Sequence, residues 1–110
     1  MFKKSERLTR SEFTAFFATG KRQHFPHVTV IHQPYPTRKV AVVVGKKVAT
    51  SAVQRNKYKR RILGILYAWV VEKNISGVLI LLIKPSFRTL TRKDAQAELK
   101  NVIAQVTKSA

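Results

Sequence analysis

A dense cluster of basic residues stands in the middle of the chain. Five of the seven residues from 55 to 61 are Lys or Arg, and the segment reads Arg55-Asn56-Lys57-Tyr58-Lys59-Arg60-Arg61. The residues around it have the spacing of an amphipathic helix, so these charges would form a fixed array on a helix surface. Such an array meets phosphates at defined positions, which predicts a folded nucleic acid as the partner.

The apolar spacing places half of this helix outside the core. One stripe of its C-terminal half contains Ile62, Ile65, Leu66 and Trp69. The same stripe, traced toward the N-terminus, reaches Tyr58 and the cations Arg55 and Lys59. Burying these two cations without partners would cost several kcal/mol each. We therefore expect the first two turns to overhang the core or line an open cleft, with Lys57, Arg60 and Arg61 pointing to the other side.

The composition supports a polyanionic partner and one domain. The chain of 110 residues has 22 Lys plus Arg against 5 Asp plus Glu, a formal net charge of +17, and 45% hydrophobic residues. That is enough apolar material for one core, so we expect a single RNA-binding domain over residues 1–110. The absence of cysteine excludes disulfides and suits a reducing, cytoplasmic location. No signal-peptide pattern appears, and the longest apolar run, residues 78–83, is far shorter than the roughly 20 residues of a spanning helix, so no membrane partner is expected.

The acidic and histidine residues do not form a recognisable catalytic motif. The five acids are scattered as Glu6, Glu12, Glu72, Asp94 and Glu98, and no pair has metal-ligand spacing. The histidines His24, His27 and His32 surround a predicted strand without a partner motif. The segment Gly45-Lys46-Lys47 lacks the further glycines and the Ser or Thr of a phosphate-binding loop. We predict no catalytic residue and no metal site in this chain.

A short aromatic helix is expected near the N-terminus. Thr9 and Glu12 have capping-box spacing, and Gly20 would end the helix in a left-handed conformation. Three phenylalanines follow one face, Phe13, Phe16 and Phe17. A core stripe is the simplest interpretation, and we apply it to Phe16. Phe13 and Phe17 remain candidates either for the core or for stacking on unpaired bases.

The remaining pattern predicts three strands and two further helices. Strands are expected over residues 27–33, 39–44 and 78–83, the first two as an antiparallel pair and the third as a central strand. The long helix would run from residue 50 or 51 to 73. A last helix would begin after Thr91 and bury Ala95, Leu99, Val102, Ile103 and Val106. The order α-β-β-α-β-α predicts an α+β, single-domain, two-layer sandwich.

At these residues the chain resembles the protein subunit of bacterial ribonuclease P. That family has a basic helix written Arg-Asn-Arg-x-Lys-Arg-x-x-Arg after a strand that ends in Ser-Lys-Lys and a short link. The matching segments here are residues 55–60 and 45–53, and the opening Arg7-Leu8 followed by Phe13, Phe17 and Gly20 also agrees. The departures are Lys57 for Arg, Leu63 for the last Arg, Gly45 for Ser and Ala49 for Gly, with Arg61 a candidate substitute for the missing arginine.

The resemblance implies a fold and a division of labour. The sheet would be small and mixed, with a left-handed β-α-β crossover like that of domain 2 of ribosomal protein S5, although the general rule is right-handed. Catalysis would belong to a large RNA, which with its substrate binds Mg²⁺ and removes the 5′ leader of precursor tRNA. Contacts to the catalytic RNA would come from Arg55, Asn56, Lys57, Arg60, Arg61, Lys46 and Lys47. The leader would lie against Phe13, Phe17, Ile31, Val43 and Lys59. No obligate protein partner, DNA or membrane is implied.

Other functions remain open on the residues alone. A ribosomal or other structural RNA-binding protein shares the small α+β fold and the basic composition. A self-sufficient nuclease is disfavoured by the scattered carboxylates. A DNA-binding module is disfavoured because the helix signals show no helix-turn-helix pair.

Overall fold

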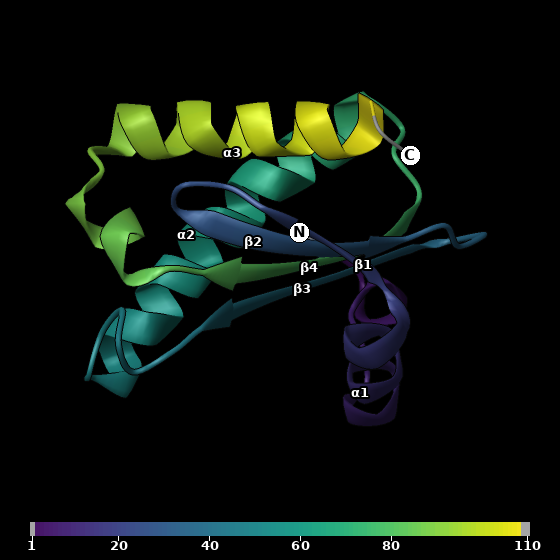
Figure 1. Ribbon diagram of the computed structural model, residues 1–110, viewed down its shortest axis with the longest axis horizontal. Coiled ribbons are helices and arrows are strands. Elements are labelled where there is room, and N and C mark those ends of the chain that lie inside the picture. The colour runs from purple at the N-terminus through teal and green to yellow at the C-terminus, as the bar shows by residue number, and fades with distance from the viewer. Residues whose placement is uncertain (1, 109–110) are drawn as a thin grey trace.

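The fold is a four-stranded sheet with two long helices on one face and a short helix on the other (Figure 1). It was obtained as a computed structural model, which describes residues 2–108. The helices are α1 (Arg10–Thr19), α2 (Ala52–Glu72) and α3 (Arg92–Lys108), with short 3-10 turns η1 (Lys4–Glu6) and η2 (Pro85–Thr89). The strands are β1 (Lys21–His24), β2 (Val28–Gln33), β3 (Arg38–Val44) and β4 (Gly77–Ile83). The predicted α+β class is confirmed.

The sheet differs from the predicted pairing. Its strand order is β1-β2-β4-β3, with β2 antiparallel to β4 and β3 parallel to β4. The expectation that β2 and β3 form an antiparallel pair was wrong, because the later strand β4 lies between them. Strand β1, which pairs with β2, was not predicted, because Lys21-Arg22-Gln23-His24 lacks any alternation of apolar and polar residues.

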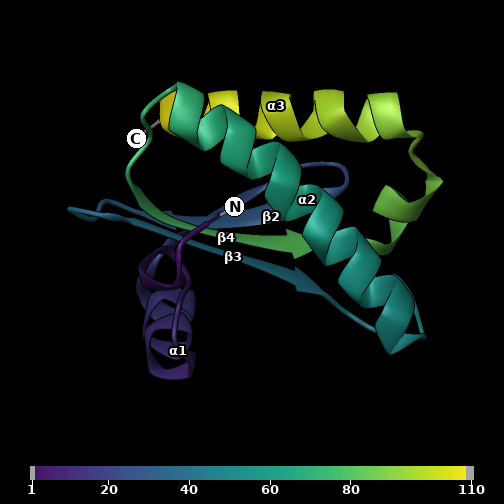
Figure 2. The same cartoon turned by 180° about the vertical axis from the view of Figure 1, so that it is seen from behind.

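The connection from β3 through α2 to β4 is left-handed. In Figure 2, α2 lies in front of the sheet, β3 and β4 both run from left to right, and β4 lies above β3. A right-handed unit seen this way would place the second strand below the first. The family resemblance therefore predicted the handedness correctly where the general rule did not.

The main core lies between the sheet and the two long helices. Alternate residues of the strands point to this side, among them Val28, Val30 and Leu81, each with no exposed surface. Helix α3 contributes the predicted stripe Ala95, Leu99, Val102, Ile103 and Val106, all buried. Helix α2 contributes Ile62, Leu66 and Val70. No helix in the described part of the chain is long and apolar enough to cross a membrane.

The helix starts follow the predicted capping. Thr9 and Glu12 form a capping box at α1, the Ser51 hydroxyl caps α2, and the Thr91 hydroxyl accepts from the Asp94 amide at 3.1 Å. The left-handed stop at Gly20 was wrong, because its φ is −69°. Glycine is required there for space, since a Cβ would lie 2.5 Å from Ile31 Cγ2 and 2.9 Å from the Phe16 carbonyl oxygen.

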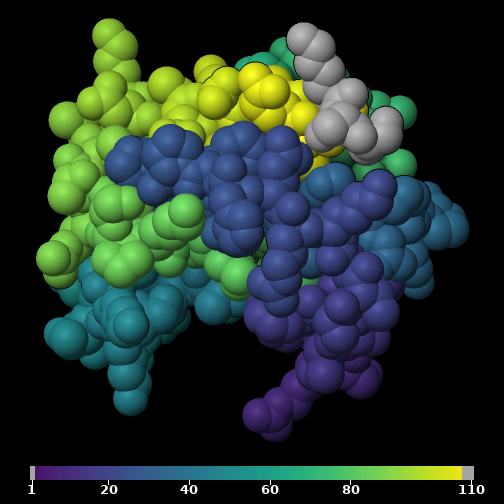
Figure 3. Space-filling view, viewed as in Figure 1, coloured from purple at the N-terminus to yellow at the C-terminus, as the bar shows by residue number. Residues whose placement is uncertain are grey.

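Helix α1 covers only part of the opposite sheet face. A second, smaller cluster there contains the buried residues Ile31, Val78 and Ile80, with Phe13, Phe16 and Phe17 packed against it. Beyond α1, the same face carries Val43, whose exposed fraction is 37%. The uncovered part of the sheet faces the space between α1 and the start of α2, where Figure 3 shows a hollow in the surface.

Candidate RNA-binding cleft and basic helix

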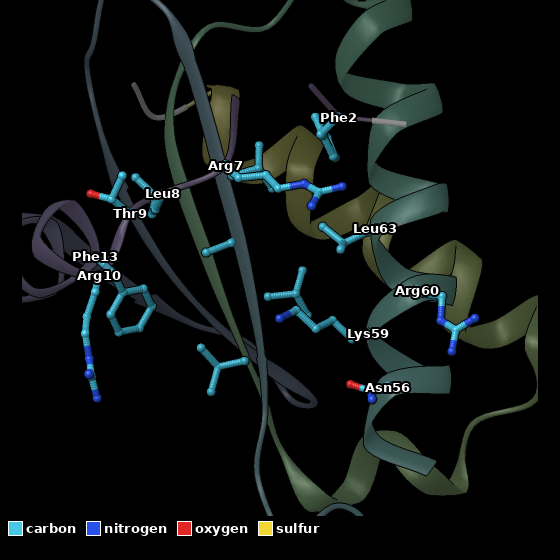
Figure 4. A pocket seen from close by; sticks show the side chains of 14 residues that line it. Phe2, Arg7, Leu8, Thr9, Arg10, Phe13, Asn56, Lys59, Arg60 and Leu63 are labelled. Carbon is cyan, nitrogen blue, oxygen red and sulfur yellow. The ribbon is translucent and has the colours of Figure 1, made fainter. Parts of the chain in front are cut away.

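A cleft of about 650 Å³ lies between the N-terminal segment, β3 and the first half of α2 (Figure 4). Residues from three separate parts of the chain meet there. They are Phe2, Arg7, Leu8, Thr9, Arg10, Phe13, Val40, Ala41, Val42, Val43, Asn56, Lys59, Arg60 and Leu63. The sequence analysis assigned residues of the aromatic helix, of β3 and of the basic helix to this site, namely Phe13, Val43 and Lys59, but it did not include the N-terminal segment.

The walls of the cleft are basic and its floor is apolar. Asn56, Lys59 and Arg60 come from α2, and the Lys59 side chain extends from that helix toward β3 (Figure 4). Arg7 and Arg10 come from the N-terminal segment and the start of α1. Residues 40–43 of β3 supply the apolar floor, and none of the described residues that line this cleft is Asp or Glu. Such a surface suits a flexible polyanion with apolar faces, which describes a single RNA strand.

The exposed half of α2 is confirmed. Asn56, Lys57, Lys59, Arg60 and Arg61 are all exposed, whereas the fully buried positions of this helix begin only at Ile62. Tyr58 is half-buried and packs against the main core, so burial along this side of the helix decreases over the one turn from Ile62 to Tyr58. The first two turns thus form one wall of the cleft, which is one of the two arrangements that the spacing allowed. Arg60 was expected to point away from this side, but it is among the residues that line the cleft.

Arg55 is half-buried and has a structural contact that the sequence did not predict. Its Nη1 atom donates to the carbonyl oxygens of Ala49 at 3.0 Å and Thr50 at 2.7 Å. These bonds tie the helix to the loop that precedes it. Lys46 and Lys47 are exposed in the same loop, so Arg55 holds two of the predicted RNA-binding residues beside the basic helix.

The predicted leader-binding residues are only partly brought together. Phe13, Val43 and Lys59 line the cleft. Phe17 does not line it, but its ring stacks on Phe13 with centroids 5.6 Å apart, and the Arg22 guanidinium lies 4.5 Å from the Phe17 ring centroid. All three phenylalanines of α1 are half-buried, so each is partly core and partly surface.

The assignment of Ile31 to the leader surface is corrected by the structure. Ile31 has no exposed surface, because α1 packs directly over it and over Val78 and Ile80. Its side chain therefore supports α1 from below. The family resemblance alone had assigned Ile31 to the leader surface, and it did not indicate which part of the sheet α1 covers.

Arg61 does not take the place of the missing arginine at position 63. Leu63 lines the cleft, while Arg61 lines a separate groove between α2 and α3. The two positions are two residues apart on a helix, about 200° around its axis, so they face opposite sides. The cleft wall is consequently more apolar at this point than the family motif implied.

The N-terminal segment was not predicted to line the cleft. Phe2 is buried and meets the Tyr67 ring edge-on at 5.2 Å, and Arg7 forms an isolated parallel bridge with Val40. These contacts place Arg7, Leu8 and Thr9 along β3. The sequence offered only the aromatic residue at position 2 as a signal, and one apolar side chain does not indicate where, or whether, it is buried.

Two ion pairs hold this segment against β3. The Glu6 carboxylate accepts from the Lys3 amide at 2.7 Å and from Arg38 Nη1 at 2.8 Å. The Glu12 carboxylate accepts from the Thr9 amide at 2.9 Å and lies 3.3 Å from Lys39 Nζ. Each backbone hydrogen bond, helped by the neighbouring cation, lowers the pKa of its carboxyl below the ordinary value. Within residues 2–108, no three His, Asp or Glu side chains are arranged to hold a metal ion.

Comparison with known proteins places this geometry in a family. The family model described as Ribonuclease P matches residues 2–107. The chain belongs to the ribonuclease P protein family. The ribonuclease P protein component of Microcystis aeruginosa is 30% identical over 103 residues, which cover 87% of this chain and 85% of the relative. That of a Synechococcus species is 27% identical over 100 residues, covering 86% and 75%.

Solved structures of ribonuclease P proteins have the same fold. The Staphylococcus aureus protein superposes with a TM-score of 0.80 at 21% identity, covering 94% of this chain and 96% of that one. The Thermotoga maritima protein gives a TM-score of 0.73 at 22% identity, covering 88% and 94%. The four-stranded mixed sheet with three helices is therefore the fold of this family.

Proposed function

We propose that the chain acts as the protein component of a ribonuclease P, binding both the catalytic RNA and the 5′ leader of precursor tRNA. One observation carries the proposal, namely that the exposed basic half of α2 forms a wall of an apolar-floored cleft. One side of α2 is thereby available to a structured RNA, while the other side faces the cleft, which suits a single strand. The family membership supports the same assignment.

The proposed contact with the catalytic RNA uses the outer side of α2 and the loop before it. Lys46, Lys47, Lys57 and Arg61 are exposed there, and the exposed Arg60 lines the cleft as well. Arg55, which bonds its own loop, acts mainly by positioning these cations. Neutralising several phosphates at fixed spacing releases counterions, so this binding should weaken steeply as salt rises.

The proposed leader site is the cleft. Lys59 and Asn56 on one wall, and Arg7 and Arg10 on the other, could meet phosphates along a strand. The family motif had assigned Asn56 to the catalytic RNA, and we move it to the leader because it lines the cleft. Phe13 offers part of a ring for base stacking, which is worth about 1–3 kcal/mol per base. Contacts of these kinds carry little sequence information, which suits leaders of varied sequence.

In this proposal the RNA carries the chemistry. Mg²⁺ would be bound by the catalytic RNA and its substrate, where it supports hydrolysis of the phosphodiester bond. This chain's residues would bind, position and neutralise charge between two RNAs, which lowers the magnesium concentration that the assembly needs.

Reconstitution tests the proposal directly. The purified chain is added to a bacterial ribonuclease P RNA at a magnesium concentration too low for the RNA to act efficiently alone, and cleavage of a precursor tRNA is followed. We expect a large increase in correct 5′ cleavage. An unchanged rate, with the chain bound to the RNA, would instead favour a structural RNA-binding protein, and cleavage by the chain freed of RNA would indicate a nuclease.

A further inference from the structure

A second basic groove lies between α2 and α3, away from the cleft. The two helices pack on the same sheet face and diverge toward their N-termini (Figure 2). The groove between them measures about 430 Å³ and includes Arg60, Arg61, Gly64, Ala68, Gln96 and Lys100 in its lining. Arg61, Gly64 and Ala68 follow one stripe of α2, while Gln96 and Lys100 are neighbours on one face of α3.

Cations from both helices gather around one ring in this groove. Lys73 Nζ of the α2 end lies 5.3 Å from the Trp69 ring centroid, and Lys100 Nζ of α3 lies 5.5 Å from it. Arg60 and Arg61 add positive charge further along α2, and among the described residues of the lining Glu72 is the one acid. Like charges held this close repel one another, and a bound polyanion would relieve the repulsion.

Gly64 contributes no side chain to the floor of the groove. It lies inside a helix of 21 residues, where glycine disfavours the helix relative to alanine. A Cβ atom at this position would meet nothing within 4 Å, so packing within the chain does not require glycine. Glycine at such a site permits the close approach of another backbone.

We propose that this groove binds the sugar–phosphate backbone of double-helical RNA. Exposed cations stand on both helices, and the small residues Gly64 and Ala68 let a backbone come close between them. Unpaired bases fit less well, because the one ring in the lining, Trp69, already has two ammonium groups beside it. The cleft and the groove thus suit two forms of RNA, a single strand and a duplex.

The inference rests on the proposed function, which supplies ribonuclease P RNA as the source of the duplex. A paired segment of that RNA would lie across α2 and α3 while the leader lies on the other side of α2. Arg60, which lines both the cleft and the groove, stands between the two RNAs.

Directed cleavage tests the contact. The chain has no cysteine, so Gly64→Cys gives a unique attachment site for an iron–EDTA group that cleaves nearby RNA. Thr37→Cys is the control, exposed at the turn between β2 and β3. Bound to ribonuclease P RNA, the Gly64→Cys conjugate should cut base-paired segments that the control does not cut. Cuts confined to unpaired segments, or a pattern equal to that of the control, would overturn the proposal.

Binding measurements supply an independent test. The double variant Arg61→Ala/Lys100→Ala should bind ribonuclease P RNA about tenfold more weakly at 0.15 M salt. The slope of log affinity against log salt concentration should decrease in magnitude by about two. The control Lys4→Ala/Lys21→Ala removes the same charge from exposed positions elsewhere and should change affinity less than twofold. Gly64→Gln should raise the melting temperature of the free chain, because glutamine favours a helix, yet lower its affinity for the RNA.

The outcomes separate this inference from the proposed function. Equal affinity of the groove variant and its control, with wild-type binding still specific for ribonuclease P RNA, would overturn the groove alone. If the wild type binds that RNA no better than an unrelated folded RNA, the proposed function fails. In that case the groove proposal is tested with an RNA duplex of unrelated sequence. Equal affinity of Arg61→Ala/Lys100→Ala and Lys4→Ala/Lys21→Ala for this duplex would reject the groove proposal.

Discussion

Lys59 lines the cleft from the first half of α2. Its side chain leaves the basic helix on the line that is apolar one turn later, and it extends over the β3 floor instead of into the core (Figure 4). Because it is exposed and lines the cleft beside Asn56, its replacement should affect a bound strand and leave the fold intact.

Lys59→Ala should raise KM for precursor tRNA that carries a leader by roughly fivefold, about 1 kcal/mol for one charged contact. Cleavage of a substrate with its leader shortened to one nucleotide should be nearly unchanged, because the lost contact is absent there. The exposed Lys4, in η1, provides the control Lys4→Ala. Equal KM increases on both substrates would place Lys59 against the tRNA body or the catalytic RNA instead.

Phe13 and Phe16 lie on one helix but differ in their surroundings. Phe13→Leu keeps an apolar side chain and removes the ring that lines the cleft, so leader affinity should fall by about 1–3 kcal/mol with little change in melting temperature. Phe16→Leu removes a ring packed edge-on against Tyr35 at 5.4 Å, so stability should fall while leader affinity holds. Thermal unfolding and fluorescence titration with leader oligonucleotides distinguish the two. The reverse pattern would exclude base stacking on Phe13.

At the scale of elements, the loop before α2 depends on Arg55. Two hydrogen bonds from one guanidinium fix the carbonyl groups of residues 49 and 50. Since Lys46 and Lys47 project from this loop, its order matters for RNA binding as well as for stability.

Arg55→Ala should lower the free energy of unfolding by about 1.5–3 kcal/mol, because both bonds have a charged donor. Lys57→Ala is a matched control on the same helix, exposed, and should change it by about 0.5 kcal/mol or less. Urea unfolding of the free proteins measures both. Similar small effects would mean that Arg55 is available to the RNA and does not hold the loop.

The N-terminal segment should detach from β3 as pH falls. Glu6 and Glu12 have a folded pKa below the ordinary 4.5, so the stability they contribute is present above that value and is lost as pH drops through the lower folded pKa. Wild type should therefore exceed Glu6→Gln/Glu12→Gln in stability at neutral pH, and the difference should vanish in acid. Denaturant unfolding between pH 7 and pH 2.5 tests this. A difference that stays constant with pH would show that the carboxylate charges do not hold the segment.

At the scale of the whole molecule, the net charge of +17 makes the stability of the free chain and its affinity for RNA respond to salt in opposite directions. From 0.01 M to 0.15 M salt the Debye length falls from about 30 Å to about 8 Å. Repulsion between the many cations is then screened, so the free chain should melt at a higher temperature. Its affinity for RNA should fall, because releasing counterions into a more concentrated salt solution gains less entropy.

Thermal unfolding followed by circular dichroism, and filter binding to ribonuclease P RNA, measure the two responses. Lys4→Glu/Lys21→Glu reduces the charge at exposed positions outside the cleft and the groove, and it should flatten the salt dependence of the melting temperature. A free chain that is less stable at higher salt would mean that its few ion pairs outweigh the repulsion.

Local sequence signals were sufficient for most of the elements. The capping box at Thr9, the stripe of α3 from Ala95 to Val106, and the long helix after Ser51 all appear where the pattern predicts them, because each depends on neighbours within a few residues. Strand β1 was missed because its four polar residues form a strand only by pairing with β2.

The sequence by itself determined that this chain is a basic α+β protein whose longest helix has an exposed cationic half, because helical period and charge are properties of consecutive residues. Only the tertiary structure decided that β4 lies between β2 and β3, that α1 buries Ile31, and that the N-terminal segment forms a wall of the cleft. It also decided that Arg61 faces α3 and not the cleft. These facts depend on contacts between distant residues, whose geometry no local pattern contains.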